Sequence, residues 1–173
     1  VTVIVLSELK RISGDARINL EVIQRMDIEI LEIPDAKRWI KGRRMVKACD
    51  AIIDGILGTG LNSPVRGFYR KVIEEVNSLG KPVMSIDIPS GLNADTGQIM
   101  GVAIKADLTV TFGFPKIGQM IFPGAEIVGR LARIHIGIPE SVGRQIPESA
   151  IMSEPDDFHH LFFRLSHTHH EVY

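Results

Sequence analysis

The stretch DAIIDGILGTGLNSPVRG, residues 50–67, decides the fold expected for this chain. Its first half is apolar between two carboxylates, which is typical of a strand covered on both faces in a parallel sheet. The strand is expected over residues 50–57, with Asp54 near its carboxyl end, and it opens into a loop containing Gly58 and Gly60 before the next helix. Glycines let backbone N–H groups approach an anion closely, and the amino-terminal end of a helix attracts negative charge. The stretch therefore predicts a phosphate-bearing ligand beside an acidic residue.

Outward from this stretch, apolar runs alternate with helical segments along the chain. Strands that alternate with helices of about ten or more residues are the signature of βαβ units. A short helical turn is also expected just before residue 107. The chain is therefore expected to be an α/β protein, a three-layer Rossmann-like sandwich with a mostly parallel sheet. Its other strands are expected at residues 1–7, 28–33, 81–88, 107–112 and 131–136, and its helices from about residue 13 to 26, from 34 through 45 and over 68–79.

Composition and charge restrict the class of protein. The chain has 173 residues, 45% of them hydrophobic, so it can bury a core without disulfides. Its formal net charge of −1 leaves no basic excess for nucleic acid, which argues against such a partner. A single cysteine, Cys49, suits the reducing cytoplasm. No apolar run approaches the ~20 residues of a membrane helix. A cytoplasmic protein without a membrane contact is therefore expected.

The character of the sequence changes after residue 139. Residues 140–155 are polar and interrupted by proline, as in a linker, and the remaining residues combine aromatic side chains with five of the six histidines. His167 with His169 or His170 could bind zinc. A tetrahedral zinc site, however, needs about three or four ligands on a rigid frame, and no cysteine or HExxH pattern supports one. We therefore expect one domain over residues 1–139 and a linker and tail over residues 140–173.

Three polar residues share one place in the expected sheet. Asp54 and Asp87 each come at the end of a parallel strand, and Ser90 follows in the loop after the second of these strands. Because the carboxyl ends of parallel strands meet at one edge, the three side chains are expected around one site. Their oxygens could hold a cation, or one carboxylate could act as a general acid or base. The alternative is structural: Asp54 caps the following turn, and Asp87 and Ser90 form a strand-ending turn with a helix cap.

The loop GTGLNSP is less specific by itself. It has neither the GKS or GKT of a Walker loop nor a complete GxGxxG fingerprint, and a tight strand-to-helix connection would look the same. Lys116 in FPKIG could reach a phosphate or could simply be solvated. The absence of a Walker lysine and of an evident magnesium-binding pair counts against a phosphotransferase.

Four motifs in a fixed order give the chain a family resemblance. DAIIDGILGTGLNSPVRG, IDIPSGLNADTG, KADLTVTFGFPKIG and FPGAE follow one another as in the NAD(P)H-hydrate epimerase family, and SGDARIN upstream fits the same pattern. The resemblance covers about residues 1–139. It implies an isomerase that interconverts the R and S forms of hydrated NADH and NADPH (NADHX and NADPHX). A partner dehydratase, a lyase that accepts only the S form, then restores the cofactor.

The resemblance also implies roles for individual residues. Asp54 and Ser90 fall on positions that bind a potassium ion, and Asp87 falls on the substrate-binding and catalytic aspartate. The family tends to dimerise, so a homodimer or higher oligomer is expected. The dinucleotide-binding loop is implied at Gly58, Thr59, Gly60, Leu61, Asn62, Ser63 and Pro64.

One part of the family pattern is missing from this sequence. Family members carry an earlier strand and an NNGGDG-like loop, which supplies a substrate-binding segment and a potassium ligand. By resemblance this strand lies in the middle of the sheet, between the strands at residues 1–7 and 50–57. A fragment of a longer protein is therefore expected. The alternatives are a strand supplied otherwise, or a nucleotide-binding or scaffold protein without turnover. RLSHTHHEVY stands where the dehydratase domain of bifunctional members would begin, but it lacks their KG.

Overall fold

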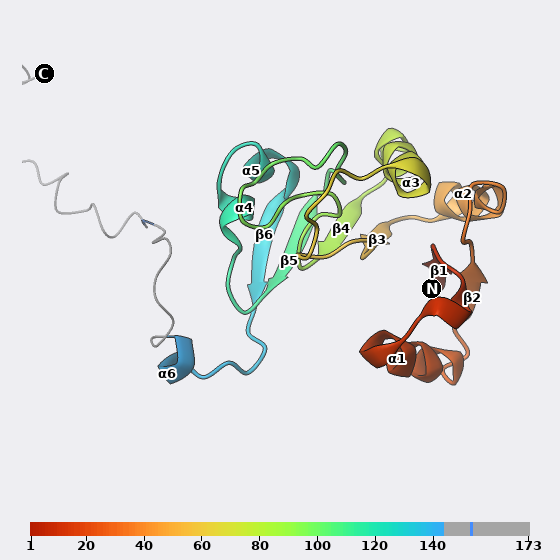
Figure 1. Ribbon diagram of the computed structural model, residues 1–173, viewed down its shortest axis with the longest axis horizontal. Coiled ribbons are helices and arrows are strands. Elements are labelled where there is room, and N and C mark those ends of the chain that lie inside the picture. The colour runs from red at the N-terminus through yellow and green to blue at the C-terminus, as the bar shows by residue number, and fades with distance from the viewer. Residues whose placement is uncertain (144–152, 154–173) are drawn as a thin grey trace, which may run out of the picture. The chain divides into compact units, whose positions relative to one another are not determined.

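The computed structural model describes residues 1–143 and residue 153 (Figure 1). The chain divides into two compact units, Val1–Gly137 and a unit that begins at Ile138, and all of the described strands belong to the first. The expected strands and long helices are present as β1 Thr2–Val5, α1 Gly14–Gln24, β2 Glu29–Glu32, α2 Trp39–Ala48, β3 Ile52–Asp54, α3 Gly67–Ser78, β4 Val83–Ile86, β5 Leu108–Phe112 and β6 Arg130–Ile134. The shorter helical segments are η1 Leu9–Arg11, α4 Ile117–Met120, α5 Gly124–Ile127 and, in the second unit, α6 Glu140–Gly143.

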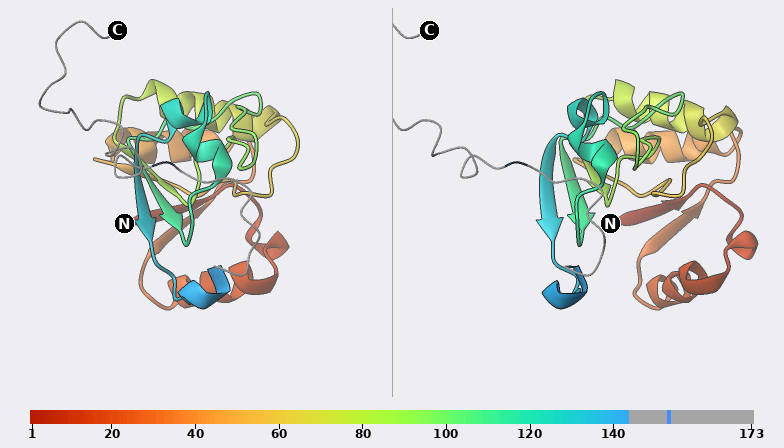
Figure 2. Two further views of the ribbon diagram at one scale, coloured as in Figure 1. Left: turned by 90° about the vertical axis from the view of Figure 1, so that its left-hand side faces the viewer. Right: turned by 60° about the vertical axis from the view of Figure 1, so that its left-hand side comes forward.

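The strands form parallel sheets, as the alternation of strands and helices predicted. β1 pairs with β2, and β3, β4, β5 and β6 pair in that order in a second sheet (Figure 2). Every pairing between these strands is parallel. The α/β class is therefore confirmed.

The sheet is divided at one point. Among the described residues, no ladder joins β1 to β3, so the two-stranded and four-stranded sheets are separate. The break lies where the family resemblance places an additional strand. Two parallel strands thus each have an edge without a partner from the described part of the chain, and such edges accept strands from elsewhere.

The principal core lies between the strands and the two helices α2 and α3. The apolar residues of α3 recur at helical spacing, and Val72, Ile73 and Val76 are all buried. They share one cluster with Ile33 after β2 and with Trp39 at the start of α2. α1 lies on the opposite side of the β1–β2 sheet from α2, which gives this part of the molecule three layers (Figures 1 and 2).

One face of the four-stranded sheet is exposed, which corrects the expectation of strands covered on both faces. Ile53 and Ile134 are 62% and 47% exposed, and Ile86 and Phe112 lie on the same face. Because side chains alternate along a strand, the neighbouring Asp54 points to the opposite, buried face. Within the described residues, the helices of the first unit bury only that second face.

The helical turn expected just before residue 107 is wrong. Residues 102–106 form no helix and run alongside other loops. The N–H of Ile104 donates to the carbonyl of Ser90 (2.8 Å), and Ile104 is fully buried. Hydrogen bonds to a neighbouring loop have replaced those of a helical turn, a tertiary effect that local sequence does not reveal.

The core assignment predicts a large difference between two helical isoleucines. Ile73 is 0% exposed and Ile40 is 64% exposed. Ile73→Ala is expected to lower the free energy of unfolding by about 2–5 kcal/mol because it leaves a cavity. Ile40→Ala is expected to change it by about 0.5 kcal/mol or less. Urea unfolding of both variants measures this difference, and equal losses would contradict the assignment.

Candidate functional site

Asp54 ends β3 with its carboxylate inside the protein. In the β3–β4 ladder Asp54 is paired with Ser85, so both side chains point to the same buried face. Asp54 is 2% exposed, and its Oδ2 accepts a hydrogen bond from the Ser85 hydroxyl at 2.8 Å. The strand therefore fixes the carboxylate at the carboxyl end of the sheet, where the sequence predicted it.

Ser90 holds the loop after β4 against this carboxylate. Its Oγ lies 2.6 Å from Asp54 Oδ1, and its N–H donates to Oδ2 at 2.9 Å. The Ser90 hydroxyl oxygen also accepts the N–H of Leu57, immediately before Gly58, at 2.8 Å. The next residue, Gly91, has φ +98°, a conformation that favours glycine. The structure thus brings Asp54, Ser90 and the start of the glycine loop together.

The charge of Asp54 has no cationic partner in the described part of the chain. All of its hydrogen-bond donors there are neutral, and no lysine, arginine or histidine nitrogen lies within 4.0 Å. A buried carboxylate is costly unless it is paired. The carboxylate oxygens, Ser90 Oγ and the Leu57 carbonyl are the oxygen ligands that a hard cation prefers. These residues therefore fit a potassium ion.

Asp54 also caps the turn that follows β3, as the structural alternative in the sequence analysis predicted. The Ile56 N–H donates to the Asp54 carboxylate at 3.3 Å.

Asp87 follows β4 in an unusual backbone conformation. Its φ is +66°, which is uncommon for residues other than glycine and is often found at functional sites. Its N–H donates to the Val110 carbonyl at 2.8 Å, and its Oδ1 accepts the N–H of Phe112 at 3.0 Å. The Gln119 side chain donates to the Asp87 carbonyl at 2.6 Å. Asp87 is therefore held from the β5 side, and its half-buried side chain retains 27% exposure.

Lys116 is a site residue whose role the sequence left open. Its ammonium group contacts Asp87 Oδ1 and also donates to Thr111 Oγ1 at 3.0 Å and to the Phe112 carbonyl at 3.3 Å. Its side chain is 20% exposed. Lys116 thus forms an ion pair with Asp87 instead of being solvated. Its position just beyond β5, the strand beside β4, is the only signal in the sequence that could have suggested this contact.

The glycine loop is exposed, and neither packing nor backbone conformation requires its glycines. A Cβ atom at Gly58 or Gly60 would meet nothing within 4 Å, and neither residue has a left-handed φ. The carbonyl of Leu61 accepts a hydrogen bond from Asn93 at 3.3 Å, which ties the loop to the segment after β4. Space beside these two glycines is what the close approach of a ligand to the backbone would need.

The site residues therefore form two bonded groups at the same end of the sheet. Asp54, Ser90 and the start of the glycine loop make one group, and Asp87 with Lys116 makes the other. Among the described residues, no hydrogen bond joins the side chains of one group to those of the other. The two groups are connected by the loop from Asp87 to Ser90. A cavity of about 460 Å³ lies at the carboxyl ends of β1 and β2, and Phe68 at the start of α3 contributes to its lining.

Two kinds of feature are not found among the described residues. None of their helices is long and apolar enough to cross a bilayer. In residues 1–143 and 153, no group of three or more histidine, cysteine, aspartate or glutamate side chains is placed so that it could hold a metal ion. The histidines considered as zinc ligands, including His167, lie outside the described residues.

Comparison with known proteins identifies the family. The family model described as YjeF-related protein N-terminus matches residues 1–118. A bifunctional NAD(P)H-hydrate repair enzyme Nnr of Thermofilum pendens is 40% identical over 147 residues, which are 85% of this chain and 27% of that protein. An NAD(P)H-hydrate epimerase of Rhodopirellula baltica is 33% identical over 145 residues, covering 84% of this chain and 58% of that protein.

A solved structure agrees with the fold. The crystal structure of yeast ynu0 matches with a TM-score of 0.52 and 19% identity, and covers 69% of this chain and 47% of that chain. The chain spans about a quarter of the length of the Thermofilum pendens protein and less than two thirds of the Rhodopirellula baltica protein. The resemblance to the NAD(P)H-hydrate epimerases is confirmed, and the chain belongs to the family of YjeF-related protein N-terminal domains.

Proposed function

We propose that this chain supplies the epimerase part of NAD(P)H-hydrate repair, the interconversion of the R and S forms of NADHX and NADPHX. The observation that carries the proposal is Asp87, a half-buried carboxylate held in a left-handed backbone conformation and paired with Lys116 at the carboxyl end of a parallel sheet. The names of similar proteins support the same activity, since an NAD(P)H-hydrate epimerase of Limosilactobacillus fermentum is 49% identical over 87 residues.

We place this activity in a longer protein that works in the cytoplasm. Residues 1–139 would form the epimerase domain, and residues 140–173 a linker that leads toward a dehydratase domain. The support is coverage: the matched bifunctional repair enzymes extend far beyond the region shared with this chain. Within the described part of the chain, β1 and β3 each have an edge without a partner strand, and such edges favour association, so we propose a homodimer or higher oligomer.

The substrate would be held by the glycine loop. The exposed loop at Gly58 and Gly60, with open space beside both glycines, and the following amino-terminal end of α3 could receive the negatively charged diphosphate. Asp87 would contact the reacting ring. The residues assigned to substrate binding are Gly58, Thr59, Gly60, Leu61, Asn62, Ser63, Pro64 and Asp87.

A potassium ion would be held by Asp54 and Ser90. Bound there, the ion would neutralise the buried carboxylate and anchor oxygen atoms of the site and substrate. In addition to holding the ion, Asp54 and Ser90 would fix the loop that carries Asp87 through their hydrogen bonds to each other.

The proposed reaction requires a general acid–base residue at the reacting carbon. Hydrated NADH carries a hydroxyl on a saturated carbon beside the ring nitrogen, and inversion at that carbon requires the C–O or the ring C–N bond to open and re-form. Ion-paired with Lys116, the Asp87 carboxylate can take the hydroxyl proton and pass it to the ring nitrogen as the ring C–N bond opens. Both transfers reverse as the bond re-forms, so no proton is gained or lost overall. Lys116 keeps the carboxylate in place through this cycle and balances its charge.

A second function is favoured by the divided sheet. In α/β folds the crevice for a ligand lies at the switch point of the strand order, and the break between β1 and β3 falls there. The chain by itself could then bind a dinucleotide through the glycine loop without turning it over. A mixture of R- and S-NADPHX, coupled to an S-specific dehydratase, separates the two functions: recovery of NADPH from the R form requires exchange, whereas binding alone does not yield it.

Asp87→Asn is the most direct test of the catalytic assignment. Asparagine tolerates a left-handed backbone as aspartate does, so the fold should survive. Exchange is expected to fall by about 10²–10⁴-fold because the amide cannot transfer the proton. The coupled NADPH assay measures the rate, and urea unfolding provides the folding control. A folded variant with an unchanged rate would refute the role of Asp87.

Lys116→Met tests whether the ion pair positions the carboxylate. The rate of exchange is expected to fall on the order of 10–100-fold, since losing a charge-assisted hydrogen bond costs about 1.5–3 kcal/mol. Most of the loss should appear in kcat and little in KM, and Lys116→Arg should recover part of it. The exposed Lys105 is the matched control, and Lys105→Met should keep full activity. Equal rates for the two methionine variants would exclude the positioning role.

The double variant Gly58→Ala/Gly60→Ala tests the glycine loop. The free energy of unfolding should stay within about 1 kcal/mol of the wild type, because nothing in the protein contacts the added atoms. Binding of NADPH, measured by calorimetry, should weaken by about tenfold or more. Gly91→Ala should behave in the opposite way and destabilise the fold, since its backbone is left-handed and closely packed. Unchanged NADPH affinity in the double variant would remove this loop from the binding site.

A further inference from the structure

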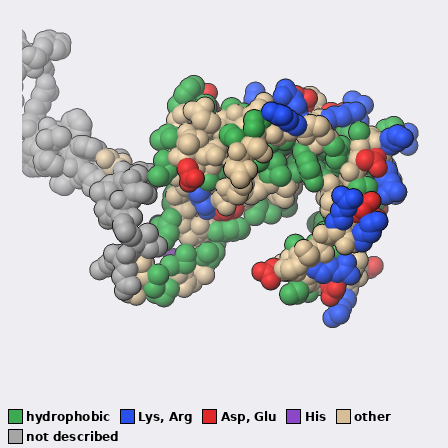
Figure 3. Space-filling model, in the orientation of Figure 1, with side chains coloured by type: hydrophobic (Ala, Val, Ile, Leu, Met, Phe, Trp, Pro, Cys, Tyr) green, Lys and Arg blue, Asp and Glu red, His purple; other side chains and the backbone are tan. Residues whose placement is uncertain are grey.

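The segment around α2 concentrates positive charge in a chain that is nearly neutral. Residues 37–47 contain six of the chain's 20 lysines and arginines, although the formal net charge is −1. No aspartate or glutamate occurs between Asp35 and Asp50. Figure 3 shows blue side chains gathered over α2 and the neighbouring β2. The charge is thus local and not a property of the whole surface.

The described structure pairs only one of these six cations with a carboxylate. Arg43 lies 3.3 Å from Glu75, and no other salt bridge among the described residues involves residues 37–47. The other long helices satisfy arginines internally, as in the pair Arg70–Glu74 at i,i+4. Like charges on neighbouring positions of a helix, such as Lys41 and Arg44 at i,i+3 in α2, repel each other. The fold therefore carries a repulsion that an external anion would relieve.

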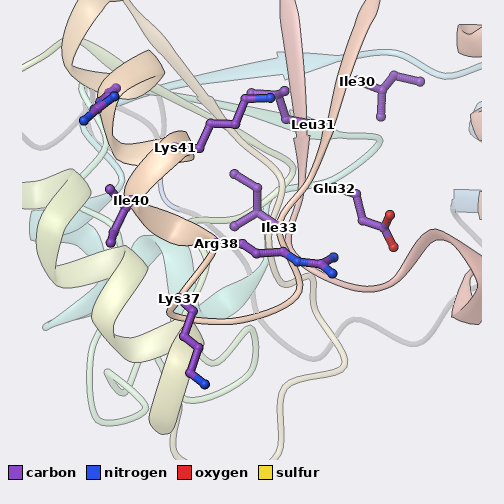
Figure 4. A pocket seen from close by; sticks show the side chains of 9 residues that line it. Ile30, Leu31, Glu32, Ile33, Lys37, Arg38, Ile40 and Lys41 are labelled. Atoms are coloured by element: carbon purple, nitrogen blue, oxygen red, sulfur yellow. The ribbon is translucent and has the colours of Figure 1, made fainter.

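Four of the unpaired cations line one surface cavity. The cavity measures about 430 Å³ and lies where α2 meets the outer strand β2. In Figure 4 the side chains of Arg38 and Lys41 extend on either side of Ile33. This volume is within the range of small-molecule sites, about 300–1,000 Å³. Its charged lining consists of Lys37, Arg38, Lys41 and Arg44 together with Glu32.

The acidic groups nearby are already used by the backbone. Asp35 accepts the N–H groups of Arg38 and Lys37 at 2.9 and 2.8 Å, and these bonds hold the pKa of Asp35 below its usual range. Glu32 accepts the N–H of Leu9 at 3.0 Å. An anion in the cavity would therefore meet four cationic side chains against the single carboxylate of Glu32, while Asp35 caps the turn that precedes α2.

We propose that this cavity binds a phosphate-bearing small molecule of the nucleoside di- or triphosphate class. The planar guanidinium groups of Arg38 and Arg44 can match phosphate oxygens in pairs, and the ammonium group of Lys41 adds a point charge to the same lining. The exposed side chain of Ile40 offers an apolar surface for the rest of the ligand. The site shares no residue with Asp54, Asp87 or Ser90, and does not depend on the function proposed above.

Calorimetric titration of the whole chain with pyrophosphate, ADP and adenosine tests this site. Pyrophosphate and ADP should bind and adenosine should not, and added salt should weaken binding. Lys41→Gln/Arg44→Gln should raise the dissociation constant by about tenfold or more. The matched control, Lys71→Gln/Lys105→Gln, removes the same charge from exposed positions outside the cavity and should keep the wild-type affinity. Amide NMR shifts on adding pyrophosphate should centre on residues 37–44.

Several results would overturn the proposal. Absence of binding by pyrophosphate and ADP at low salt would do so, as would equal losses in the two double variants, which would indicate a general effect of charge. Amide shifts confined to residues 58–64 would assign the phosphate to the glycine loop instead. Binding to vesicles of phosphatidylserine and phosphatidylcholine without binding to pyrophosphate or ADP would identify the patch as a membrane-surface contact.

Discussion

The hydrogen bonds of Asp54 organise the candidate site. This one carboxylate, at the end of β3, binds the side chain of Ser85 in the neighbouring strand and both the backbone and the hydroxyl of Ser90 in the loop beyond it. Ser90 then accepts the N–H of Leu57, just before the glycine loop. Removing any of these partners leaves a buried charge with fewer hydrogen bonds, which is costly. The same contacts therefore fix the ends of two strands, the glycine loop and the segment that carries Asp87.

The position of Asp87 follows from this arrangement. Asp87 lies three residues before Ser90, between the end of β4 and this buried serine, and its backbone is in the left-handed conformation. The carboxylate then faces β5, where Lys116 and the N–H of Phe112 meet it. Asp54 is thus buried among neutral hydrogen-bond donors, whereas Asp87 is only half-buried and is paired with the charged Lys116. Two chemically identical side chains have separate tasks because their surroundings differ.

Much of this arrangement could be predicted from the sequence, and the exceptions have physical causes. Apolar runs located the six strands of the described residues, and the rule that parallel strands end at one edge brought Asp54 and Ser90 together. The exposed face carrying Ile53 was missed because an apolar run cannot show which side will be covered. The ion pair of Lys116 was missed because it depends on the path of the chain between β5 and α4. The cavity beside α2 was also missed, since it depends on how a helix and an outer strand meet.

Amide hydrogen exchange at Leu57 and Ser90 tests the organising role of Asp54 most directly. The N–H of Ser90 donates to Asp54, and the N–H of Leu57 donates to the Ser90 hydroxyl oxygen. In the wild type both amides should therefore exchange as slowly as amides in the core strands. In Asp54→Ala both should lose protection together, even though Leu57 makes no bond to Asp54 itself. If these two amides already exchange in the wild type as fast as that of the exposed Thr59, the buried carboxylate does not hold the site together.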